Sequence, residues 1–112
     1  MKSVFNDVRI FMEAAGQTTL GYNVPQSSLY MKLIGEEFGE LLTAKNQNND
    51  TEIADACFDL IWVLTGYMLS RGWDVNKIWD EGALSNLRKI DPESKKVLKR
   101  EDGKVLKPKG WK

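Results

Sequence analysis

The segment from Ala56 to Leu69 constrains the fold most strongly. Its fourteen residues are almost all apolar, with Asp59 among them, and its apolar residues do not keep to one stripe of a helix. A membrane-spanning helix needs about 20 consecutive apolar residues, so we expect a buried helix of a soluble protein. A helix that is apolar all round must be covered on every side, which a domain of 112 residues can hardly achieve alone. We therefore expect a second subunit to pack on it, as a homodimer or a homotetramer.

Hydrophobic periodicity predicts four helices in total. Apolar residues recur at helical spacing over residues 4–15, 27–47 and 74–90, and the apolar segment belongs to a helix over residues 52–71. The polar turn at 46–50 should join two of these helices into an antiparallel helical hairpin. We expect polar residues to cap the later helices: Ser27 or Ser28, Asp50 or Thr51, and Asp74.

The chain from Asp91 onwards contains proline, glycine and many lysines, which break regular structure. We expect an irregular tail there, or a short β-hairpin over residues 96–106 with its turn at Glu101-Asp102-Gly103. The predicted fold class is therefore all-α. Four or five helices form a bundle built on the hairpin, in a single domain over residues 1–112.

Composition narrows the possible chemistry. Sixteen basic and sixteen acidic residues cancel, so net charge predicts neither a nucleic-acid nor a membrane partner. A single cysteine, Cys57, cannot form an internal disulfide, and no signal peptide is evident, so we expect a cytoplasmic protein. The chain has no histidine, which excludes histidine-based zinc sites and Ser-His or Cys-His catalysis. Carboxylates, lysines and arginines must carry any chemistry.

Two acidic stripes lie on the two helices of the predicted hairpin. On the first helix, three carboxylates share one side: Glu36, Glu37 and Glu40. On the second, three more lie within an arc of roughly 60°: Glu52, Asp55 and Asp59. The EExxE motif alone is most simply a solvated face, but buried carboxylates within an apolar helix need partners or a metal. The two stripes together therefore predict a divalent cation with oxygen ligands, and magnesium is the usual choice beside phosphates.

The spacing Glu36-Glu37-x-x-Glu40 followed by Glu52-x-x-Asp55 resembles a known family. It is similar to the all-α nucleoside triphosphate pyrophosphohydrolases, the MazG-like and phosphoribosyl-ATP pyrophosphohydrolase-like group. Three further segments look like successive segments of that family, and the resemblance spans about residues 28–111: DTEIADACFDLIWVLTG at 50–66, SNLRK at 85–89 and DGKVLKP at 102–108. The EExxE motif by itself is weak, whereas the ordered set is fairly specific.

The resemblance implies hydrolysis of a nucleoside or deoxynucleoside triphosphate to the monophosphate and pyrophosphate, in nucleotide-pool house-cleaning. It implies Mg²⁺, with Mn²⁺ as a possible substitute, held by four carboxylates: Glu37, Glu40, Glu52 and Asp55. Glu36 would act with Glu37 and Glu40 in catalysis, through a second ion or by orienting water. Substrate contacts would come from Asn86, Lys89, Lys104 and Lys107, and Trp111 is the best candidate for stacking on the base.

Several alternatives remain open at this stage. The base and sugar of the substrate are not determined, although phosphoribosyl-ATP is least favoured because Asp59 stands where that subgroup usually carries histidine. A different class of function is a non-catalytic helical oligomer that binds nucleotides or a protein partner. Such a protein should have lost one or more acidic positions of the family motif. All five are present here: Glu36, Glu37, Glu40, Glu52 and Asp55. A structural coiled coil is a third possibility, but it predicts strict heptads that residues 52–71 do not show.

Overall fold

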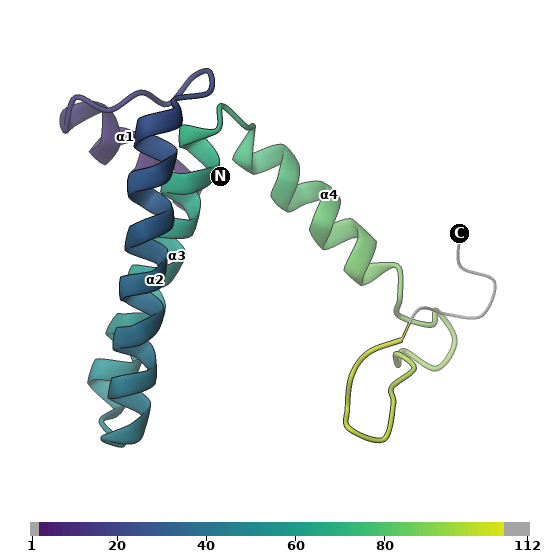
Figure 1. Cartoon of the computed structure of the whole chain (residues 1–112). Coiled ribbons are helices and arrows are strands. Elements are labelled where there is room, and N and C mark those ends of the chain that lie inside the picture. The colour runs from purple at the N-terminus through teal and green to yellow at the C-terminus, as the bar shows by residue number, and fades with distance from the viewer. Residues whose placement is uncertain (1–2, 107–112) are drawn as a thin grey trace. The chain divides into compact units, whose positions relative to one another are not determined.

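The computed structural model describes residues 3–106, and within them the chain forms four α-helices and no β-strand (Figure 1). The helices are α1 (Val4–Ala14), α2 (Val24–Asn46), α3 (Asp50–Ser70) and α4 (Val75–Leu87). This confirms the all-α class. The chain separates into two compact units, Met1–Asn76 and Lys77–Lys112. A single domain over the whole chain stays a prediction.

Helices α2 and α3 lie side by side in the first unit, and α1 packs on α3 (Figure 1). The apolar core joins these three helices and the first residue of α4, and its buried members are Val8, Met12, Tyr30, Val63, Leu69 and Val75. Tyr30 of α2 lies directly against Gly66 of α3, where a Cβ atom would overlap the tyrosine ring. This close contact sets how α2 and α3 meet, and hence which of their residues share a surface.

Helix α2 begins earlier than the sequence predicted. Asn23 has an extended backbone, and its side chain accepts a hydrogen bond from the Gln26 amide at 3.1 Å. Pro25 lies in the first turn, where a missing N–H costs nothing. The expected caps Ser27 and Ser28 are therefore wrong, because Asn23 as the cap and Pro25 in the first turn already start the helix.

Helix α3 is capped one residue before the predicted positions. The Asn49 side chain accepts a hydrogen bond from the Glu52 amide at 3.1 Å, and Asp50 and Thr51 lie inside the first turn. Helix α4 ends at Leu87, before the expected position near residue 90. In all these cases the helix itself was predicted correctly and only its limit moved by a few residues.

The connection between α1 and α2 is tied to the end of α3. The Gln26 side-chain nitrogen Nε2 donates to the Thr18 carbonyl at 2.7 Å and to the Ser70 hydroxyl at 2.8 Å. The Asn23 backbone amide donates to the Ser70 carbonyl at 2.8 Å. Gly72 packs so closely on Gly21 that a Cβ would contact its backbone. These contacts anchor the connection against the carboxyl end of α3.

Helix α3 is only partly covered by the described residues 3–106. Val63 and Leu69 are buried, whereas Phe58 and Ile61 are 54% and 57% exposed and Leu64 is 42% exposed. The predicted cover on every side is thus absent from the described chain, and the second subunit stays a prediction. By length and composition α3 could also cross a membrane, with a mean hydropathy of 1.4. That is weak evidence, because core helices of soluble proteins pass the same test and Asp55 and Asp59 would be costly in lipid.

The tail of the second unit turns twice. Asp91 closes the first turn, since its amide donates to the Lys96 carbonyl and its own carbonyl accepts from the Lys95 amide, both at 2.8 Å. The second turn includes Gly103, whose φ is +91°, and an isolated antiparallel bridge joins Lys99 to Val105. No strand forms in the described part of the tail, so the short β-hairpin is not confirmed.

Candidate metal-binding site

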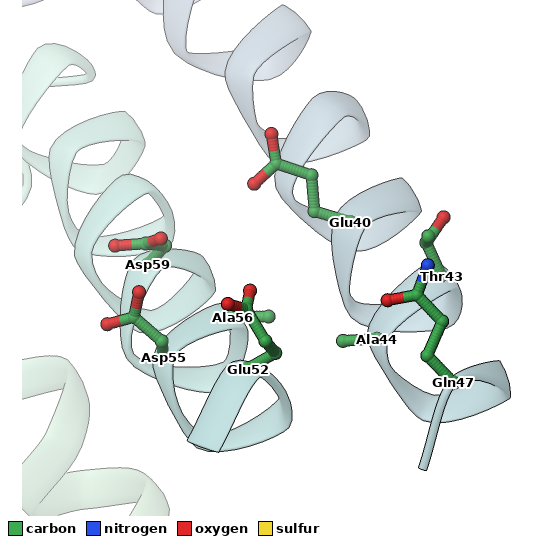
Figure 2. A pocket seen from close by; sticks show the side chains of 8 residues that line it. All are labelled: Glu40, Thr43, Ala44, Gln47, Glu52, Asp55, Ala56 and Asp59. Atoms are coloured by element: carbon green, nitrogen blue, oxygen red, sulfur yellow. The ribbon is translucent and has the colours of Figure 1, made fainter. Parts of the chain in front are cut away.

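A groove of about 250 Å³ lies between the carboxyl-terminal part of α2 and the amino-terminal part of α3 (Figure 2). Two buried alanines, Ala44 and Ala56, face each other across it, and their small side chains leave room for the polar residues around them. Those polar residues are Glu40 and Thr43 from α2, Gln47 just after its end, and Glu52, Asp55 and Asp59 from α3. The groove is therefore acidic on both of its walls.

Three carboxylates from the two helices form a cluster, of which Glu40 and Asp59 line this groove and Glu37 does not. One oxygen each from Glu37, Glu40 and Asp59 lies within 4.8 Å of the others. Two oxygens bound to one Mg²⁺ at about 2.1 Å lie at most about 4.2 Å apart, so small side-chain rotations would bring all three within coordination distance. None of the three forms an ion pair with a basic side chain of residues 3–106. The donor set is the hard-oxygen kind that divalent cations require.

The pKa values of two carboxyl groups in the cluster are raised, as expected for negative charges that lie close together. Partial burial raises the pKa of Glu37, and the neighbouring Glu40, Asp59 and Glu36 raise it further. Partial burial also raises the pKa of Asp59, with contributions from Asp55 and Glu40. One oxygen of Glu37, Oε2, is buried and has no hydrogen-bond partner among the described residues. A cation at this position would satisfy that oxygen and offset the repulsion among the negative charges.

The residues predicted as metal ligands fall into two groups. Glu37 and Glu40 belong to the three-carboxylate cluster, whereas Glu52 and Asp55 line the same groove as Glu40 without joining that cluster. Glu36 is exposed and acts on Glu37 through its charge. The ligand roles of Glu52 and Asp55, and the catalytic role of Glu36, stay predictions.

Asp59 is the residue that sequence reasoning left without a role. It was placed in the second acidic stripe but was not included among the ligands, although its oxygen meets those of Glu37 and Glu40. The sequence feature that could have identified Asp59 as a ligand is its position one turn after Asp55, where it places a charge inside an apolar helix. Only the packing of α2 on α3 selects it over Glu52 and Asp55.

The predicted substrate-binding residues belong to the second unit. The Lys89 ammonium donates to the Asn86 side-chain oxygen at 3.0 Å, so these two residues lie together as their spacing predicted. The Lys104 backbone amide donates to Asp102 at 3.1 Å in the second turn. Lys107 and Trp111 lie outside the described residues. The contact of any of these residues with a substrate stays a prediction.

Comparison with known proteins gives two matches. The profile of the phosphoribosyl-ATP pyrophosphohydrolase family matches residues 11–86, which include the whole acidic groove. An uncharacterised protein of Acanthamoeba polyphaga mimivirus is 51% identical to this chain over 43 residues. That match covers 38% of this chain and only 17% of the viral protein's length.

Proposed function

The chain belongs to the phosphoribosyl-ATP pyrophosphohydrolase family, within the MazG-like superfamily, and from this premise we propose that it hydrolyses a nucleoside or deoxynucleoside triphosphate to the monophosphate and pyrophosphate with Mg²⁺ as cofactor. The observation that carries the proposal is the convergence of Glu37, Glu40 and Asp59. Glu40 and Asp59 line a groove that Glu52 and Asp55 also line. The proposed role is the removal of unwanted nucleotides from the cellular pool. We place this role in the cytoplasm.

The scaffold in this proposal is an antiparallel helical hairpin. The contacts between the two helices support it, because Tyr30 near the start of α2 meets Gly66 near the end of α3. Further along α2, Glu40 meets Asp59, which lies earlier in α3. This order of contacts supports opposite directions of the two helices. A hairpin of this kind holds carboxylates from both helices at one place on rigid elements.

The chemistry follows from the residues of the groove. A divalent cation bound there would neutralise charge on the phosphates and lower the pKa of water. Glu37, Glu40 and Asp59 would hold it, with Glu52 and Asp55 as further oxygen ligands from the groove wall. Glu36, exposed beside Glu37, would orient the attacking water and accept its proton. The triphosphate would be contacted by Asn86, Lys89, Lys104 and Lys107, and the base by Trp111.

We also propose that the active protein is a homodimer or a homotetramer. The exposed Phe58, Ile61 and Leu64 of α3 support this, because water would otherwise contact a continuous apolar surface. Burial of apolar surface stabilises by about 25 cal/mol per Å², which favours association of two such surfaces. Neither a membrane nor a nucleic acid is part of the proposal.

The decisive experiment is Mg²⁺-dependent pyrophosphate release from a panel of common and modified nucleoside triphosphates, with Glu40→Gln as the test variant. We expect turnover in Mg²⁺, no turnover in EDTA, and a loss of at least about 100-fold in kcat for Glu40→Gln, because a metal ligand is removed. Glu101→Gln makes the same chemical change at an exposed position of the tail and should keep full activity.

A different result would support the non-catalytic alternative. If no nucleotide of the panel is hydrolysed and Glu40→Gln binds nucleotides as tightly as the parent protein, the chain is a binding module rather than an enzyme. Identification of the products separates the reaction classes, because release of orthophosphate and a diphosphate would contradict the proposed pyrophosphohydrolysis.

A further inference from the structure

Charge is strongly segregated along this neutral chain. The first unit, Met1–Asn76, carries ten acidic and five basic residues, whereas the second, Lys77–Lys112, carries eleven basic and six acidic residues. The two units thus have net charges of −5 and +5. A highly charged anion such as a triphosphate is repelled by the first unit until a cation binds there. The second unit attracts the same anion without any cation.

The basic residues of the second unit gather around its first turn. Three lysines, Lys95, Lys96 and Lys99, line one hollow of about 500 Å³. Lys96 also lines a second hollow of about 330 Å³, together with Arg88 and Lys89. The ammonium groups of the three lysines have no hydrogen-bond or ion-pair partner among residues 3–106. Arg100, by contrast, already pairs with Asp102 at 2.7 Å.

The backbone of this turn is held by its own hydrogen bonds. The Asp91 carboxylate accepts from the Glu93 amide at 3.0 Å and from the Ser94 hydroxyl at 3.1 Å, and the Ser94 oxygen accepts from the Lys96 amide at 3.3 Å. Lys95 adopts a φ of +62°, a left-handed conformation that favours glycine and asparagine over lysine. The turn therefore keeps a long cationic side chain at a position where local backbone preference disfavours it.

We propose that this turn, residues 88–99, is an anion site that binds a pyrophosphate group independently of the metal site. The proposal rests on the proposed function, which makes pyrophosphate a product and places the same group in the substrate. Lys95, Lys96 and Lys99 supply the positive charge, and Asp91 holds the turn that presents them. The bound group comes from free pyrophosphate or from the phosphates of a nucleotide.

The composition of the turn favours a bare phosphate anion over a nucleic acid. Proteins that bind single-stranded nucleic acid usually combine a basic groove with aromatic side chains on which bases stack. Residues 88–106 contain no aromatic residue. Acidic residues also interrupt the positive charge, at Asp91 and Glu93 within the turn and at Glu101 after it. A small, highly charged anion fits this arrangement better than a long polymer.

Calorimetric titration of the full-length protein with sodium pyrophosphate in EDTA tests the site without turnover. We expect saturable binding, weakened about tenfold by Lys95→Gln/Lys96→Gln because two charges next to the anion are removed. The matched control is Lys32→Gln/Lys45→Gln, which removes the same charge from exposed positions of α2 and should bind within about twofold of the parent. Glu40→Gln should bind pyrophosphate in EDTA as the parent does.

Two results would overturn the proposal: no saturable binding in EDTA, or equal weakening in both double variants. A nonhydrolysable nucleoside triphosphate analogue, titrated in parallel, identifies the source of the group. Binding of the analogue assigns the site to nucleotides, and binding of pyrophosphate alone assigns it to the product. Loss of hydrolysis in Mg²⁺ would contradict the proposed function and leave the EDTA titration unaffected, so the two failures are distinguishable.

Discussion

Glu37 and Asp59 differ from ordinary surface carboxylates because they share a small space with other negative charges. Partial burial is the largest cause of their raised pKa values, and repulsion from the neighbouring carboxylates adds to it. The cost of this arrangement is present in the metal-free protein and is relieved when a cation binds. Such groups are common at functional sites, where binding a ligand is what offsets the repulsion.

The raised pKa values predict how the stability of the metal-free protein depends on pH. The folded state holds these protons more tightly than the unfolded chain, whose carboxyls titrate near about 4. The contribution to stability is therefore full below that pH and is lost as pH rises through the folded pKa values of Glu37 and Asp59. Urea unfolding in EDTA between about pH 4 and 8 should show this loss, and Asp59→Asn should reduce it.

Magnesium should reverse that trend. A ligand that binds only the folded state raises the free energy of unfolding, by an amount that grows with the logarithm of the ligand concentration relative to Kd. At neutral pH, added Mg²⁺ should raise the urea midpoint of the parent protein and leave that of Asp59→Asn nearly unchanged. An equal rise in both proteins would show that Asp59 is not a ligand.

Gly66 is predicted to tolerate substitution poorly. A Cβ there would overlap the ring of Tyr30, a buried residue whose hydroxyl donates to Gln17 at 2.7 Å. Gly66→Ala should therefore destabilise the protein by about 1–3 kcal/mol through overpacking. Gly35→Ala is the matched control inside a helix with open space around it, and it should stabilise by up to about 1 kcal/mol. Urea unfolding measures both.

At the scale of the elements, the start of α3 links the fold to the acidic groove. The Asn49 side chain caps the helix by accepting a hydrogen bond from the Glu52 backbone amide. Glu52 is the first residue of α3 that lines the groove, so the cap holds the backbone of that residue in place. The preceding Asn48 lies in the connection between α2 and α3 and has a φ of +53°, a left-handed conformation that asparagine adopts more readily than most residues. The local turn and its cap thus fix where α3 begins, and with it the position of Glu52 in the first turn of the helix.

Removal of this cap gives a prediction for the element. Asn49→Ala should lower the free energy of unfolding by about 1 kcal/mol, and Asn49→Asp should preserve it because aspartate caps as well as asparagine. If Glu52 is a ligand, Asn49→Ala should also weaken Mg²⁺ binding measured by calorimetry. Unchanged Mg²⁺ affinity with reduced stability would remove Glu52 from the ligand set.

At the scale of the whole molecule, the exposed side of α3 predicts self-association. Ile61 is at the centre of the exposed apolar residues, between Phe58 and Leu64. Ile61→Glu should shift the sedimentation coefficient from that of an oligomer towards that of a monomer, because a charge would be buried without a partner. Thr51→Glu, an exposed position at the start of α3, should leave the oligomer intact. A monomeric parent protein would contradict the prediction.

Much of the local structure was determined by the sequence alone. The helices follow from apolar spacing, which depends on each segment's own residues, and the two acidic stripes follow from helical geometry. The limits of the helices were less certain because several polar residues compete as caps within a few positions. Asn23 and Asn49 replaced the predicted serine, aspartate and threonine caps for that reason.

The tertiary structure alone decided which residues of the two stripes meet. Asp59, rather than Glu52 or Asp55, joins Glu37 and Glu40, because the register of α3 against α2 is set by distant contacts such as Tyr30 on Gly66. The side of α3 that remains exposed depends on the same packing. Periodicity gives each helix its faces, but only long-range packing chooses which face is buried and which carboxylates share a site.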